Sequence, residues 1–137
     1  MIAYRGIRRL GLALLATLAV GACDDDSTRP EPPARYTVEV SGERFAVEVS
    51  TQAQIADMEA RLASGEEGVI NGRLAAGDAG YNDPWSWHMV PATVEAVDMS
   101  IEVCDGRPSM VEDDLDYWLN TVERFCPWGA KVVARGS

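Results

Sequence analysis

The chain of 137 residues has one histidine, His88, and one lysine, Lys131, and it lacks several patterns on which catalysis commonly depends. No Cys-x-x-Cys pair accompanies the single histidine, which disfavours a zinc site. No Asp-x-Asp-x-Asp-Gly loop occurs, which disfavours a calcium site. Ser86 and Ser109 lack the context of a nucleophile elbow, which disfavours hydrolase chemistry. We therefore expect a protein that is not an enzyme and that holds no metal or cofactor.

Basic residues are also scarce. Lysine and arginine together number 12 against 22 acidic residues, which gives a formal net charge of −10. Without the three arginines of residues 1–22, nine basic groups face 22 acidic groups, a net charge of about −13. Such a surface disfavours nucleic acid and anionic lipid headgroups, and it favours cations or basic partners. No nucleic-acid-binding module is present.

Residues 1–22 have the organisation of an export signal. Arg5, Arg8 and Arg9 form a basic start, and residues 10–20 form an apolar run. Residues 18–23, LAVGAC, resemble a bacterial lipobox, which implies that Cys23 is acylated, with palmitate for example, and becomes the mature N-terminus. Several acyl chains anchor a protein stably. We therefore expect a lipoprotein attached to a membrane on the exported side of a bacterial cell envelope.

Two other interpretations of this segment stay open. It could be an ordinary secretory signal with a chance cysteine. A transmembrane anchor is less favoured because the apolar run is shorter than the roughly 20 residues that a bilayer requires. The triplet Asp24–Asp26 resembles the inner-membrane retention signal of some bacterial lipoproteins, and the choice between inner and outer membrane stays open.

Residues 23–34 are acidic and proline-rich after the cysteine, which predicts an extended tether. Residues 35–137 are long enough for a single domain with a core. Period-two alternation on both sides of Ser41-Gly42 predicts a β-hairpin, and a helix should follow from Ser50 or Thr51 to Gly65. Further strands are expected at residues 68–74, 97–104 and 130–134. A second helix should begin with a capping box of Ser109 and Glu112 and stop at Cys126-Pro127.

The order of these elements predicts an α+β domain, with a small antiparallel or mixed sheet and about two helices on one face. Cys104 and Cys126 remain once Cys23 carries lipid, and two cysteines in an exported chain indicate a disulfide. Its loop of about 22 residues would contribute roughly 3 kcal/mol. A metal-binding cysteine pair is the alternative. The bridge should bring Trp128 close to the Asp105 turn.

Residues 80–91, GYNDPWSWHMVP, hold two of the four tryptophans and the only histidine. Their rings and Trp128 could form an aromatic platform for a glycan or a peptide. The alternative is that the rings fill the core. His88 could be a metal ligand or general base with Glu95, Asp98, Glu102 or Asp105 as partner, or it could hold a turn by binding a loop carbonyl. The candidate ligand-binding residues are Tyr81, Asn82, Trp85, Trp87, His88, Asp105 and Trp128.

Three motifs together carry a resemblance to a known domain. They read YNDPWSWH at residues 81–88, EVCDGRPS at residues 102–109 and FCPW at residues 125–128. This pattern resembles a domain found at the N-terminus of a eukaryotic calmodulin-binding protein and in bacterial secreted proteins and lipoproteins. The resemblance covers residues 35–135 and implies a compact α+β domain with a Cys104–Cys126 bridge. It supplies no catalytic residues, and it does not imply calmodulin binding by this domain.

We therefore expect a membrane-anchored envelope lipoprotein whose domain binds a protein or glycan without catalysis. Two alternatives stay open. One is a metal-dependent or acid–base enzyme that uses His88, and the other is a purely structural envelope module.

Overall fold

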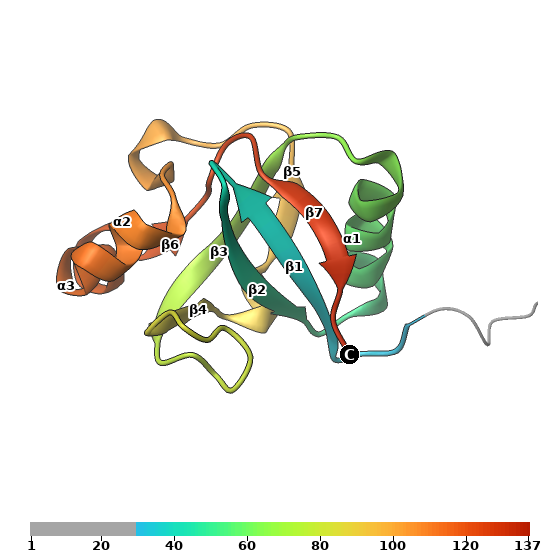
Figure 1. Ribbon diagram of the computed structural model, residues 1–137, viewed down its shortest axis with the longest axis horizontal. Coiled ribbons are helices and arrows are strands. Elements are labelled where there is room, and N and C mark those ends of the chain that lie inside the picture. The colour runs from blue at the N-terminus through green and yellow to red at the C-terminus, as the bar shows by residue number, and fades with distance from the viewer. Residues whose placement is uncertain (1–29) are drawn as a thin grey trace, which may run out of the picture.

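The computed structural model describes residues 30–137 (Figure 1). The predicted signal segment 1–22, Cys23 and most of the predicted tether therefore lie outside the described residues. Seven strands and three α-helical segments fold around one main core, and strand pairing is antiparallel throughout. The α+β class is confirmed, with two sheets in place of the single sheet that was expected.

The first sheet contains strands β2, β1 and β7 in that order. Strands β1 (Ala34–Val40) and β2 (Glu43–Val49) form the predicted hairpin. Its two turn residues, Ser41 and Gly42, both have positive φ values of 52° and 78°, the pattern of a type I′ turn. Strand β7 (Lys131–Arg135) pairs with β1, so the first and last strands of the domain lie side by side.

The second sheet is organised around β3 (Val69–Ala76). Strands β4 (Trp87–Met89) and β5 (Glu95–Val97) pair with its two ends, and β6 (Arg124–Phe125) pairs with its centre. Gly72 lies on β3 where an added Cβ would meet the Met89 side chain at 2.7 Å, so this position requires glycine.

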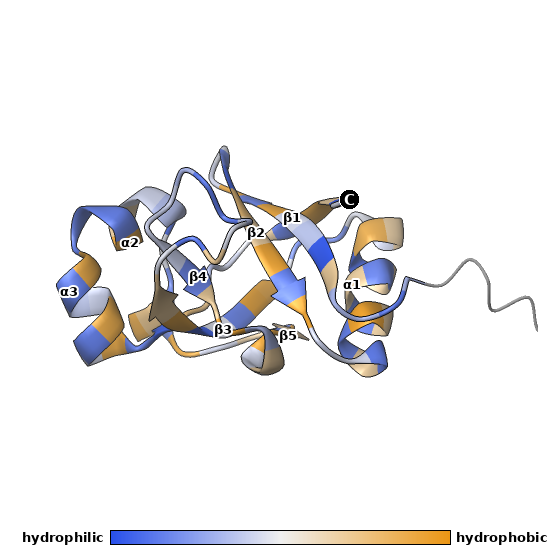
Figure 2. Ribbon diagram, turned by 90° about the horizontal axis from the view of Figure 1, so that it is seen from below, coloured by the Kyte–Doolittle hydropathy of each residue, from blue (hydrophilic) through white to orange (hydrophobic). Residues whose placement is uncertain are grey.

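Helix α1 (Gln52–Ser64) follows the hairpin as predicted. Thr51 caps it, since its hydroxyl accepts the Gln54 N–H while the Gln54 side chain accepts the Thr51 N–H. Gly65 ends it with φ 66°. The helix buries Ile55 and Met58, and its alternating hydrophobic and hydrophilic residues are visible in Figure 2. No helix within residues 30–137 is long and apolar enough to span a membrane.

The second predicted helix is broken into shorter pieces. Helix α2 (Pro108–Asp113), helix α3 (Leu115–Tyr117) and a wide turn at Trp118–Val122 replace it. They lie at the opposite end of the molecule from α1, so the helices do not share one face (Figure 1). Pro108 occupies the first helical position, which makes Arg107 the N-cap. Ser109 is therefore not the cap, and the predicted capping box is wrong.

The expected strand at residues 97–104 is also wrong beyond Val97. The chain bends out of the sheet at Asp98, and residues 102–104 form one turn of 3₁₀ helix that leads into the disulfide. Cys104 and Cys126 are bonded, with Cα atoms 5.1 Å apart, which confirms the bridge and removes the metal-pair alternative. The Cys126 N–H also donates to the Cys104 carbonyl at 2.8 Å. Sheet pairing is therefore given up where the chain turns to reach Cys126.

Candidate functional site

The loop that precedes β4 is tied into the core by Asn82 and Trp87. Asn82 is 1% exposed, and its amide accepts the Ala46 N–H and donates to the Trp87 carbonyl, both at 2.7 Å. Trp87 is 0% exposed and its ring packs against Phe45 and Phe125. Neither side chain reaches the surface. The structure therefore places these two predicted ligand-binding residues in the core.

Tyr81, Trp85 and His88 are partly exposed, but each uses its polar atom within the fold. The Tyr81 hydroxyl donates to the Met89 carbonyl at 3.2 Å, and Trp85 Nε1 donates to the Arg44 carbonyl at 2.8 Å. His88 Nδ1 donates to the Gly77 carbonyl at 2.7 Å, which is the turn-holding role. None of the hydrogen bonds and ion pairs described for residues 30–137 joins His88 to a carboxylate.

Two serine–glutamate contacts, which the sequence did not reveal, attach α2 to the rest of the domain. Glu43 accepts both the N–H and the hydroxyl of Ser109, at 2.8 and 2.7 Å. Because Ser109 lies in the first turn of α2, the Glu43 carboxylate also satisfies the positive end of that helix. Glu112 likewise accepts the N–H and hydroxyl of Ser86, at 2.8 and 2.7 Å. The acids assigned to helix capping thus hold separate segments together.

Asp105 and Trp128 meet at the disulfide, as predicted. Asp105 Oδ1 accepts the backbone N–H groups of Gly106 and Trp128, both at 2.8 Å. Trp128 is 40% exposed and lines a hollow of about 250 Å³ together with Ser41, Asp105, Gly106, Arg107 and Met110. The turn and the indole ring therefore form an accessible site with one aromatic surface and groups of both charges.

Three further apolar side chains lie exposed beside this turn. Met99, Ile101 and Val103 have exposed fractions of 75%, 64% and 60%. The alternation that was interpreted as a buried strand instead places these residues in solvent. Together with Met110 and Trp128 they surround the Cys104–Cys126 bridge in the sequence and the fold, and we name these five residues the disulfide face. The sequence did not reveal this face because period-two alternation alone does not say which side is buried.

The candidate residues do not form one site. Arg35, at the start of β1, lies over the Tyr81 ring with its guanidinium carbon 5.2 Å from the centroid. Ser41, just beyond the end of β1, lines the hollow that contains Trp128. A strand of seven residues, roughly 20 Å long, lies between them. Tyr81 and Trp128 are therefore at opposite ends of the domain, and Trp128 does not contribute to a platform with Tyr81.

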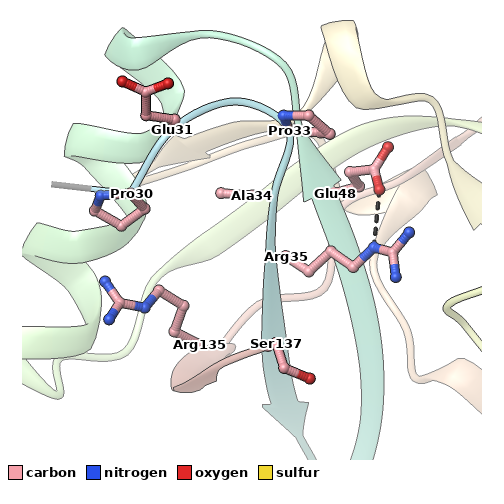
Figure 3. Close-up of a pocket in the computed structure, with 9 residues that line it drawn as sticks. Pro30, Glu31, Pro33, Ala34, Arg35, Glu48, Arg135 and Ser137 are labelled. Carbon is pink, nitrogen blue, oxygen red and sulfur yellow. Dashed lines mark hydrogen bonds and ion pairs between the residues drawn. The ribbon is translucent and has the colours of Figure 1, made fainter.

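A larger cavity, of about 400 Å³, lies at the Tyr81 end (Figure 3). Its lining comes from the entry into β1, the end of β2 and the chain after β7, and includes Glu31, Arg35, Glu48 and Arg135. Arg35 Nε is 2.9 Å from Glu48 Oε2, so part of this charge is neutralised internally. Burial raises the pKa of Tyr81 to about 12, with Glu48 adding to the shift and Arg35 opposing it. The lining is polar and its guanidinium groups have carboxylate neighbours.

These features define the class: a small disulfide-bonded α+β domain whose histidine serves the fold and whose exposed apolar residues gather at one end. The chain matches the family model described as the BP-74 N-terminal domain over residues 33–136, and it belongs to this family. Comparison with curated proteins and with solved structures finds no significant match. The resemblance that the three motifs carry is therefore confirmed for the domain.

Proposed function

We propose that the chain is a lipid-anchored lipoprotein of a bacterial cell envelope whose domain binds a partner, without catalysis, through the disulfide face. The exposure of Met99, Ile101 and Val103 supports it most directly. Isolated apolar residues on a surface are ordinary, but a group of them on one face is typical of an interaction site. The polar groups of Tyr81, Trp85 and His88 serve the fold, which favours this face over the Gly80–Pro91 loop.

The position of the tether agrees with such a role. Pro30, where the described chain begins, lines the cavity at the start of β1, and the disulfide face lies near the other end of that strand. Cys23 is seven residues before Pro30, a span of at most about 25 Å. An acyl chain on Cys23 would therefore hold the Tyr81 end towards the membrane and leave the disulfide face directed away from it.

A glycan is a second candidate ligand, and the Trp128 hollow favours it. An exposed indole ring beside the Asp105 carboxylate and the Arg107 guanidinium offers one apolar surface with donors and acceptors around it. The hollow, at about 250 Å³, is large enough for a single sugar ring.

Two experiments test the proposal. Labelling cells with radioactive palmitate should mark the wild-type chain and not Cys23→Ser, and labelling of both or neither would overturn the anchor. A photo-crosslinking residue in place of Ile101 should give a defined adduct in intact cells. The same residue in place of Ala63, an exposed position on α1, is the matched control. Equal adducts at both positions, or none at position 101, would leave a structural module as the better description.

A further inference from the structure

The disulfide face is built for contact and is held in place before any partner arrives. Of the six large hydrophobic side chains that are exposed in residues 30–137, five belong to this face. At one end of the segment that carries Met99, Ile101 and Val103, Asp98 Oδ1 is 2.7 Å from Arg61 Nη2. At the other end are the bridge to Cys126 and the hydrogen bond from Trp128 to Asp105. Little ordering entropy is therefore lost when the segment is covered.

The charge around this face has one sign. Residues 98–116 contain seven acidic residues and a single basic residue, Arg107. Asp98, Glu102, Asp105 and Asp113 are exposed. Arg107 lies 3.8 Å from Glu43, which reduces its effect on an approaching ligand. Like charges across an interface are costly and opposite charges steer association, so this rim selects a cationic partner and repels an acidic one.

The chemistry of the face itself selects an apolar side-chain surface. Met99, Ile101 and Val103 present thioether and aliphatic groups, and Met110 adds a second flexible thioether. Methionine adapts its shape to different apolar partners, which suits a segment of protein more than a fixed polar ring. Aliphatic groups that alternate with carboxylates require a ligand that offers apolar groups and positive charges in turn.

We propose that the disulfide face binds a cationic amphipathic segment of a partner protein. Apolar residues of the segment cover Met99, Ile101 and Val103, and its lysines or arginines lie against the rim carboxylates Glu102 and Asp113. This assignment rests on the proposed binding function and names the partner's chemistry.

The test uses the full chain in nanodiscs of zwitterionic lipid and a fluorescent 14-residue peptide of leucine and lysine in a helical amphipathic pattern. Binding to empty nanodiscs is subtracted. We expect Met99→Ser/Ile101→Ser/Val103→Ser to weaken binding by tenfold or more. Glu102→Gln/Asp113→Asn should weaken it severalfold and reduce its dependence on salt. Asp57→Asn/Asp78→Asn removes the same charge from exposed positions on α1 and the loop after β3, and it should change binding by less than twofold.

Equal weakening by the two charge variants would show non-specific attraction to an acidic protein and would overturn the assignment. So would equal binding of a peptide in which glutamate replaces lysine. The serine variant separates this failure from failure of the proposed function. If the peptide does not bind but the serine substitutions still abolish the adduct formed in cells from a crosslinker at Met110, the face binds a partner of different chemistry. If neither effect occurs, both proposals fall.

Discussion

The carboxylate of Asp105 holds the backbone of Trp128 across 23 positions of sequence, through a hydrogen bond of 2.8 Å beside the disulfide. The same oxygen accepts the Gly106 N–H. Replacement by alanine would remove the acceptor for two backbone donors.

Asp105→Ala should therefore lower the free energy of unfolding by about 1–2 kcal/mol. Asp105→Asn is the matched control, since its amide oxygen can still accept, and it should cost less. Urea denaturation followed by circular dichroism measures both. An asparagine variant as unstable as the alanine variant would mean that charge, and not the acceptor, is what the turn requires.

Trp87 and Trp128 should respond in opposite ways to truncation. Trp87→Ala would leave a large void beside Phe45 and Phe125 and should cost about 3–5 kcal/mol. Trp128→Ala, at a surface position, should cost under about 1 kcal/mol. Thermal unfolding of the two variants compares them. Similar losses would contradict the assignment of one ring to the core and the other to the disulfide face.

Trp87→Phe offers a finer test of the same ring. Trp87 Nε1 is the one buried side-chain polar atom in the described residues without a hydrogen-bond partner. The phenylalanine variant removes that unsatisfied donor and retains much of the apolar volume. We expect it to lose clearly less stability than Trp87→Ala, and an equal loss would show that the indole N–H has a partner in solution.

Asn82 should tolerate neither removal nor ionisation of its amide. Asn82→Ala leaves the Ala46 N–H and the Trp87 carbonyl without their partner, at a cost of roughly 2–4 kcal/mol. Asn82→Asp keeps an acceptor for Ala46 but cannot donate to Trp87 when ionised. Its stability should therefore recover in part at acidic pH, as measured by urea unfolding at pH 4 and pH 7 relative to wild type. An aspartate variant that is as stable as wild type at pH 7 would contradict the buried donor role.

Alkaline pH should destabilise the domain through Tyr81. Its pKa is raised to about 12 in the folded state, chiefly by burial, against about 10 in the unfolded chain. The unfolded state thus releases its proton first, and the stability contribution that is present below pH 10 is lost as pH rises from about 10 to 12. Burial raises the pKa of Tyr36 as well, in the same direction.

The fall in melting temperature between pH 9 and pH 11.5 should be shallower for Tyr81→Phe than for wild type, each taken relative to its own value at pH 8. Tyr117→Phe, at an exposed position, is the control and should keep the wild-type slope. A Tyr81→Phe slope identical to wild type would show that the hydroxyl does not titrate in this way.

Local patterns predicted the elements whose causes are local. The hairpin, helix α1 with its Thr51 cap and Gly65 end, and the disulfide follow from alternation, capping chemistry and cysteine count. Their determinants lie within a few residues of each other, or in the pairing of two cysteines. The proximity of Asp105 and Trp128 then followed from the bridge.

The misjudged elements depend on partners far away in the sequence. Ser109 has a capping sequence, but Pro108 starts the helix earlier and Glu43, 66 residues away, takes its donors. The alternation from Val97 to Val103 predicts a strand, but the chain leaves the sheet to reach Cys126. Only the tertiary structure shows that Met99, Ile101 and Val103 face solvent and that Tyr81 and Trp128 lie apart. The candidate site therefore moved to one end of the set of residues that the sequence indicated.

The pairing of β1 with β7 has a consequence for how the domain is made. Tyr36 pairs with Arg135, close to the end of the chain, so the first sheet can close only after almost the whole chain has been synthesised. Contacts of such long sequence separation also form slowly. A nascent chain with this arrangement stays open during synthesis, which is the state that passage through a membrane pore requires of the exported protein that we propose.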